Sequence, residues 1–194
     1  MLDIYNYISQ TQMANFSRKY NKEEIIVHEE RVAEYALKII EVVNEDNCFS
    51  KPERNLLYFS ALIHDIGYFI NKEKHQKHSR YLILSDRELD IVPGELRNFL
   101  AIIASSHRKS LDKRLELYNL ETRNKLLRLV SILRMADSLD HGHKHEIVLN
   151  KIVKEKDSLI IHIGGKGFEN IYDRFIEKTM LFNDIFRMKT LLMR

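Results

Sequence analysis

Residues 61–69 read ALIHDIGYF and place an adjacent His64–Asp65 pair at the end of an apolar run. The preceding apolar residues recur at the three- and four-residue steps of a helix, which predicts a helix over residues 52–66. Pro52 falls in the first turn of this helix, where its missing N–H costs little. Gly67 is suited to ending the helix. His64 and Asp65 are therefore expected at the rim of a helical body.

The helical period extends from residue 3 to about residue 145, and only two prolines and six glycines interrupt the 194 residues. It predicts helices over residues 3–17, 22–45, 52–66, 76–86, 93–106 and 121–140. After residue 145 the segment EIVLNKIVKEKDSLIIHIGG holds two β-branched runs, which predict a β-hairpin. Helical spacing then returns from about Phe168 to Leu192. We expect a mainly α protein, with a helical bundle over 1–145 and, packed on it, a small α/β appendage over 146–194.

The composition is that of one ordinary globular domain, with 44% hydrophobic and 30% charged residues. A net charge of +3 suits anionic ligands but is too small to indicate specific binding of nucleic acid. The sequence lacks a membrane-length apolar run, and its first residues, MLDIYNYISQ, do not resemble a signal peptide, so we predict a cytoplasmic protein without membrane contact. The lone Cys48 excludes a zinc site made of paired thiolates, so any metal must be held by histidines and carboxylates.

Four further ionisable residues continue the apolar stripes of their predicted helices: His28, His78, His107 and Asp137. Together with His64 and Asp65 they would converge on the interior of the bundle. Taken singly, each could be a hydrogen-bonded core residue. Six such groups together favour a metal site, because buried imidazoles and carboxylates must pair with one another or with a cation.

His28, then ALIHDIGYF, then RMADSLD at 134–140 resembles the H…HD…D signature of the HD-domain metal-dependent phosphohydrolase superfamily. The surrounding segments narrow the resemblance. Residues 63–83 (IHDIGYFINKEKHQKHSRYLI), 104–110 (ASSHRKS) and 126–143 (LLRLVSILRMADSLDHGH) are similar to the C-terminal helical domain of the exopolyphosphatase/guanosine pentaphosphatase family. The similarity extends over about residues 25–165.

The resemblance implies an HD-type helical fold whose divalent metal is held by His28, His64, Asp65 and Asp137. His78 and His107 match the order of the extra ligands of HD proteins that bind two ions, although an extra histidine can instead contact substrate phosphate. Mixed imidazole and carboxylate ligation suits Mn, Fe, Zn, Co or Ni, as one ion or two. Asp65 is also the candidate catalytic residue, as an acid or base beside the ion, and an uncoordinated histidine is the alternative for this role.

Positive charge near such a metal would bind phosphate, and the candidates for this role are Arg108, Lys109 and Arg134. The basic loop at residues 72–77, with Lys72, Lys74, His75 and Lys77, precedes His78 and could form the outer wall of an anion site, but it is interpreted as a solvated charge run. In the HGHKH segment at 141–145, His143 and His145 are interpreted as part of a surface turn.

Two hypotheses for function follow. The first is a metal-dependent phosphohydrolase acting on a phosphoester, phosphoanhydride or nucleotide. The alternative is a non-catalytic HD module that binds a phosphorylated ligand, polyphosphate or a partner protein, since the actin-like ATPase domains of active family members are absent from this sequence. A di-iron oxygenase uses the same order of ligands, but no sequence feature independently favours oxygen chemistry. A homo-oligomer is compatible with the sequence.

Overall fold

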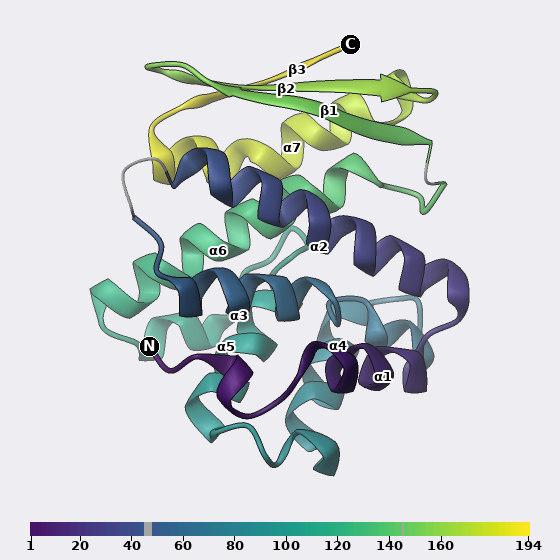
Figure 1. Cartoon of the computed structure of the whole chain (residues 1–194), viewed down its shortest axis with the longest axis vertical. Helices are drawn as coiled ribbons and strands as arrows, with labels where there is room; N and C mark the ends of the chain where they lie inside the picture. The colour runs from purple at the N-terminus through teal and green to yellow at the C-terminus, as the bar shows by residue number, and fades with distance from the viewer. Residues whose placement is uncertain (45–47, 145) are drawn as a thin grey trace.

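In the computed structural model, which describes residues 1–44, 48–144 and 146–194, α-helices make up the body and a small sheet covers one end (Figure 1). The mainly α prediction is confirmed. The helices are α1 Gln10–Tyr20, α2 Glu23–Val43, α3 Lys51–Ala61, α4 His75–Ser85, α5 Gly94–Ser105, α6 Leu120–Leu139 and α7 Phe168–Phe186. The strands are β1 Ile147–Lys154, β2 Ser158–Gly165 and β3 Lys189–Met193. Short 3₁₀ turns cover Ile4–Asn6, Ile66–Phe69, Arg87–Leu89 and Lys113–Leu117.

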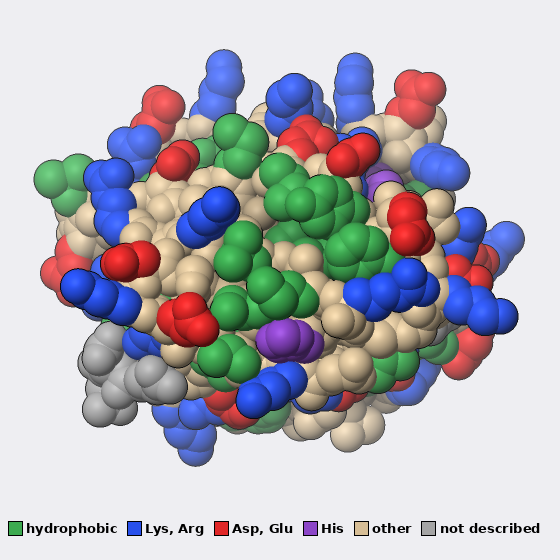
Figure 2. All heavy atoms as spheres, turned by 90° about the horizontal axis from the view of Figure 1, so that it is seen from above, with side chains coloured by type: hydrophobic (Ala, Val, Ile, Leu, Met, Phe, Trp, Pro, Cys, Tyr) green, Lys and Arg blue, Asp and Glu red, His purple; other side chains and the backbone are tan. Residues whose placement is uncertain are grey.

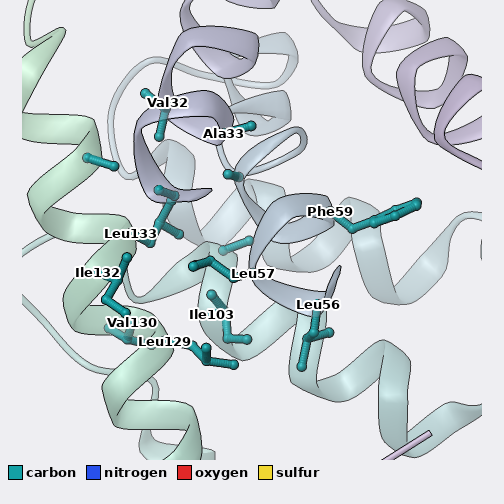
Figure 3. Close-up of a cluster of buried hydrophobic side chains, with 14 of the residues drawn as sticks. Val32, Ala33, Leu56, Leu57, Phe59, Ile103, Leu129, Val130, Ile132 and Leu133 are labelled. Carbon is teal, nitrogen blue, oxygen red and sulfur yellow. The ribbon is translucent and has the colours of Figure 1, made fainter. Parts of the chain in front are cut away.

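The hydrophobic core lies where α2, α3, α5 and α6 meet, and Figure 3 shows side chains from these helices pointing toward one another. Leu57, Ile103 and Leu133 are fully buried there. Burying a side chain of this size contributes about 1.5–3 kcal/mol. This core fixes the helices on which the polar cluster described below is built.

The first predicted helix, over residues 3–17, is interrupted. The structure has a 3₁₀ turn at Ile4–Asn6, and α1 begins only at Gln10. A capping box at Ser9 sets this start, because the Gln12 amide N–H donates to Ser9 Oγ at 3.2 Å and Gln12 Oε1 accepts from the Ser9 amide at 2.9 Å. The apolar period predicted one continuous helix here because Ile4 and Ile8, which are four residues apart, are both buried.

The predicted β-hairpin is present, with β1 and β2 antiparallel, but the chain end differs from the prediction. Helix α7 stops at Phe186, Arg187 takes a left-handed conformation with φ of 55°, and β3 then pairs parallel to β2. The prediction of helix as far as Leu192 was therefore wrong for its last residues. The strand is short and its apolar residues Leu191 and Leu192 are adjacent, so its period could not be distinguished from that of a helix.

Helix α7 lies between the sheet and α6, and β1 also contacts α2 (Figure 1). Seen from above in Figure 2, hydrophobic side chains gather in the middle of the outer sheet face and charged side chains surround them. Val148 is 53% exposed and Met193 41% exposed at the two edge strands. No helix among the described residues is long and apolar enough to cross a bilayer. The packing brings the C-terminal segment against the helices that carry the polar cluster.

Candidate metal centre

The His64–Asp65 pair lies in a turn between the end of α3 at Ala61 and the 3₁₀ turn at Ile66–Phe69. Ser79 of α4 fastens this turn, because its hydroxyl donates to the carbonyl of His64 at 2.7 Å and accepts from the amide of Gly67 at 2.9 Å. A Cβ on Gly67 would lie 2.0 Å from the carbonyl oxygen of His75. Gly67 was predicted to end the helix, but its function in the structure is to let α4 approach the turn.

Three of the other predicted residues meet at this turn, each from a different element. His28 comes from α2, Asp137 from α6, and His107 from the loop immediately after α5. All are buried, with exposures of 0% for His28, 2% for His107 and 6% for Asp137. The structure thus brings together His28, His64, Asp65, His107 and Asp137.

The imidazoles are oriented by their Nδ1 atoms. His64 Nδ1 lies 2.7 Å from the carbonyl oxygen of Ala61, and His107 Nδ1 lies 2.6 Å from that of Ala104. A carbonyl oxygen can only accept, so each Nδ1 carries the proton and each Nε2 presents a lone pair. His28 Nδ1 lies 3.0 Å from Asp140 Oδ2, which has the same effect. Histidines that bind metals are commonly held in this way by their second nitrogen.

Asp65 lies between two groups of ligand-type atoms. Its Oδ2 is 3.7 Å from Nε2 of both His28 and His64, and its Oδ1 is 3.0 Å from His75 Nε2 and 3.4 Å from His107 Nε2. Each of these triads has all of its ligand atoms within 4.8 Å of one another. Atoms bound to one ion at 2.0–2.2 Å lie about 3.0–3.5 Å apart, so both triads have nearly the size of a metal site.

His75 occupies the place in the second triad that the sequence reading gave to His78. His78 is half-buried and belongs to neither triad. The buried stripe of α4 consists of His75, Ser79, Leu82 and Ile83, whereas Tyr81, nearly one helical turn after His78, is 62% exposed. The spacing of four between His75 and Ser79 could have indicated the correct stripe, but the basic loop around His75 was interpreted as solvated.

Two nitrogen atoms that are both acceptors face each other in the second triad. His75 Nδ1 lies 3.1 Å from the Lys72 carbonyl oxygen, so its Nε2 also presents a lone pair, and this Nε2 is 3.0 Å from His107 Nε2. In the first triad, Nε2 of His28 and Nε2 of His64 are buried without a hydrogen-bond partner among the described residues. A proton or a metal ion between such atoms would remove this mismatch.

Burial lowers the pKa of His64 and lowers that of His107 to about 3, so both imidazoles are neutral at pH 7. Burial alone would also lower the pKa of His28, but Asp137 and Asp140 raise it to about 10. A proton on His28 Nε2 would face Asp65 and Asp137, at the position where a metal ion would sit. Proton and metal are therefore competitors for this atom.

Lys178 of α7 is a member of the site that the sequence reading missed. Its ammonium group donates to Asp137 Oδ2, while Asp137 Oδ1 lies 3.6 Å from His28 Nε2. Burial alone would raise the pKa of Asp137, but Lys178 and His28 hold it well below its usual range. Ile171, Phe175, Lys178 and Phe182 form the buried stripe of α7, and a lysine at such an inward position was the available signal.

A second buried carboxylate, Glu29, supports the backbone of Asp65. Glu29 Oε1 accepts from the Asp65 amide at 3.0 Å, and Glu29 Oε2 accepts from Ser17 Oγ at 2.5 Å and Asn21 Nδ2 at 3.0 Å. Burial raises the pKa of Glu29 well above its ordinary value. This residue follows His28 directly, so one turn of α2 supplies both an inward imidazole and the support of Asp65.

A cavity of about 530 Å³ opens over the two triads, and Asp65, His75, His107 and Asp137 all line it. Of the three predicted phosphate contacts, only Arg108 lines this cavity; Lys109 and Arg134 line a neighbouring one. Arg134 Nε donates to the Ser106 carbonyl at 2.7 Å, so this guanidinium holds the loop that carries His107. Other cationic side chains in the wall of the first cavity are Lys72, Arg174 and Lys178.

His143 also belongs to this cavity, although it was interpreted as part of a surface turn. The residue does lie in a turn with φ of 56°, but its ring stacks on His28 with centroids 3.9 Å apart, and its Nε2 is 3.6 Å from Asp65 Oδ2. Burial lowers its pKa to about 4. The left-handed backbone turns this side chain inward, and sequence spacing gave no sign of it. His145, the other residue of that interpretation, lies outside the described residues.

The segment 8–172 matches the family model described as Ppx/GppA phosphatase, domain III. The chain belongs to this family. Two curated relatives match it as well, both named guanosine-5'-triphosphate,3'-diphosphate pyrophosphatase. One, from Vibrio parahaemolyticus serotype O3:K6 (strain RIMD 2210633), is 30% identical over 145 residues, and the other, from Vibrio campbellii (strain ATCC BAA-1116), is 32% identical over 146 residues. Each alignment covers 72% of this chain and 28% of the relative.

The Ppx/GppA domain III match includes every residue of the two triads and Asp137, because all of them lie between residues 8 and 172. Lys178 lies beyond the matched segment. The chain spans little more than a quarter of the length of the two Vibrio proteins.

Proposed function

We propose that this Ppx/GppA domain III chain is an HD-type metal centre that hydrolyses a phosphoester or phosphoanhydride. His28, His64, Asp65 and Asp137 would hold one divalent ion, and Asp65, His75 and His107 would hold a second. The mixed nitrogen and oxygen ligands suit Mn, Fe, Zn, Co or Ni. His78, first assigned to the second ion, is replaced by His75 in this proposal.

The observation that carries the proposal is the orientation of the imidazoles. Four buried rings, those of His28, His64, His75 and His107, use Nδ1 to bind a carbonyl or carboxylate oxygen and direct Nε2 toward Asp65. A hydrogen-bonded core cluster would be expected to pair donors with acceptors. Here the Nε2 acceptors of His75 and His107 face each other, and that of His64 has no donor among the described residues, which favours a bound cation over a purely structural polar cluster.

Bound divalent ions would polarise a phosphoryl oxygen and make water a better nucleophile near pH 7. The chain's own cations would hold the substrate: Arg108 and Lys72 line the cavity and are placed to bind phosphate oxygens. Lys178 keeps Asp137 ionised and oriented. The low exposure of the cluster limits access of bulk water, which strengthens each of these interactions.

A proton must be taken up or released when the phosphorus–oxygen bond breaks, and two side chains are placed for this. Asp65 stays a candidate, although both of its oxygens face imidazoles. His143 is the second candidate, because it lines the cavity and belongs to neither triad. A variant at His143 that retains metal but loses turnover would favour the imidazole over Asp65.

The names of the two Vibrio relatives point to nucleotides that carry several phosphates, so we propose a nucleotide polyphosphate or polyphosphate as substrate of a cytoplasmic protein. The alternative is a non-catalytic module that binds such a ligand or a partner protein. The alternative is compatible with the comparison, because the match covers only 28% of each named pyrophosphatase.

Elemental analysis of protein purified without chelator, together with phosphate release from a nucleotide and polyphosphate panel with Mn²⁺, tests the proposal. We expect close to two ions per chain and turnover that is lost in His64→Ala. His162→Ala is the matched control, because His162 lies on β2, away from the cluster. Two ions without turnover would support the binding module. A chain that binds no ion after incubation with each metal would refute both the hydrolase and a binding module that retains the metal.

A further inference from the structure

A second cavity of about 490 Å³ adjoins the one over the triads. The two cavities share three side chains in their walls, those of Arg108, Arg174 and Lys178. The second cavity lies between the loop that follows α5 and the helix α7, and its remaining wall is formed by Lys109, Arg134, Glu177, Met180 and Leu181. Only these three shared side chains, among the described residues, are known to stand between the two cavities, so a long ligand could extend from one into the other.

The charge of the second cavity is strongly positive. Its wall contains five cationic side chains and a single carboxylate, Glu177. This carboxylate is engaged by Arg174, whose Nη1 lies 2.7 Å from Glu177 Oε2. Such an excess of positive charge in a concave site raises the local concentration of anions.

Two of these cations are held in fixed positions. Arg134 is only 8% exposed, and its guanidinium donates to the carbonyl oxygens of Ser106 at 2.7 Å and Lys109 at 3.3 Å. Lys178 is 9% exposed and held by Asp137. Carbonyl oxygens do not neutralise the charge of Arg134, so an anion in the cavity would relieve the cost of burying it.

One residue of the cavity wall also carries an unsatisfied donor. Arg174 Nε is buried and has no hydrogen-bond partner among the residues that the structure describes. Lys109 completes the wall with an exposed ammonium group on the same loop as Arg108. Arginine and lysine donors that converge on one hollow suit the oxygens of a phosphate group.

We propose that this basic cavity is a second phosphate subsite, so that the substrate is an extended molecule with one phosphate at the triads and another between Lys109 and Arg174. The inference rests on the proposed function for the first phosphate. It adds a requirement on the length of the substrate, because a single phosphate group would occupy only one of the two cavities. An inorganic chain or an ester with phosphates at two positions meets the requirement.

Calorimetric titration of chelator-treated protein with inorganic tripolyphosphate, and separately with orthophosphate, tests the subsite without metal. We expect Lys109→Glu to weaken tripolyphosphate binding by about tenfold or more. Lys113→Glu is the matched control, because it makes the same charge change at an exposed residue nearby that lines neither cavity, and we expect less than a twofold effect. Met180→Glu, at a rim residue that is 60% exposed, should weaken binding as Lys109→Glu does.

Equal weakening by Lys109→Glu and Lys113→Glu would indicate attraction by net charge and overturn the subsite. Tripolyphosphate binding no tighter than orthophosphate binding by the unmodified chain would overturn it too. Metal content and turnover are measured separately on the same variants. If the unmodified chain shows no turnover, the hydrolase is refuted. If Lys109→Glu nevertheless weakens tripolyphosphate binding, the subsite is retained.

Discussion

Replacing Gly67 with alanine should remove one metal ion and leave the other. The new Cβ would lie 2.0 Å from the carbonyl oxygen of His75, whereas ordinary contact begins at 3.4 Å, so the start of α4 must retreat by about 1.4 Å. Metal–ligand distances tolerate only about 0.2 Å. His75 would leave the second triad, while His28 and Asp137 belong to helices α2 and α6, which do not meet the added Cβ.

The same displacement should cost stability. The atoms that meet the Cβ include the backbone nitrogen of Ser79 at 2.4 Å, and a backbone cannot turn aside as a flexible side chain can. Overpacking of this kind costs about 1–3 kcal/mol of unfolding free energy. Urea denaturation of the metal-free protein measures this cost, and elemental analysis measures the ion lost.

Gly94→Ala is the control, because no heavy atom lies within 4 Å of the Cβ it would add, and α5 begins there. We expect this control to be neutral or stabilising by up to about 1 kcal/mol. If Gly67→Ala bound two ions per chain, or unfolded at the same urea concentration as the original protein, the argument that close approach of α4 builds the second triad would be wrong.

Three further substitutions test the remaining assignments. His75→Ala should lower the metal content from two ions to one while His78→Ala leaves it unchanged by elemental analysis, and the reverse pattern would restore the assignment read from sequence. Glu29→Leu should lower the free energy of unfolding in urea by about 2–3 kcal/mol, since the amide of Asp65 and the hydroxyl of Ser17 lose their acceptor. Glu29→Gln keeps an acceptor for Asp65 and should cost less, so equal losses of stability in the two variants would contradict a positioning function. Lys178→Met should destabilise the chelator-treated protein by about 3–5 kcal/mol, because the buried Asp137 would lose the ammonium group that contacts it and keep only the more distant His28; a change as small as that of the exposed Lys189→Met would count against the pair.

The sequence predicted the helical body because periodic apolar residues dominate it, and it predicted the hairpin because two β-branched runs flank a polar turn. Five metal-site candidates were brought together by the fold, since each continued an apolar stripe that the core buries. The errors have local causes. His75 was overlooked because lysines surround it, and the inward position of His143 depends on a left-handed backbone that no spacing reports.

Lys109 and Arg134 were predicted to contact phosphate beside the metal, but a linear pattern could not assign them to a separate cavity. That separation depends on α7, which returns to the bundle after the hairpin and places Arg174 and Lys178 between two hollows. Contacts between segments distant in the chain are the information that periodicity lacks.

The contact between Lys178 and Asp137 has a consequence for how such a chain can be recombined. The two residues are 41 positions apart and lie on opposite sides of the change in sequence character near residue 145. A gene fusion or designed chimera that replaced the chain from residue 146 onward would retain both triads. It would lose Lys178, the lysine that contacts the Asp137 carboxylate. A chimera that preserves the site must therefore include more than the candidate ligands: it must also include α7.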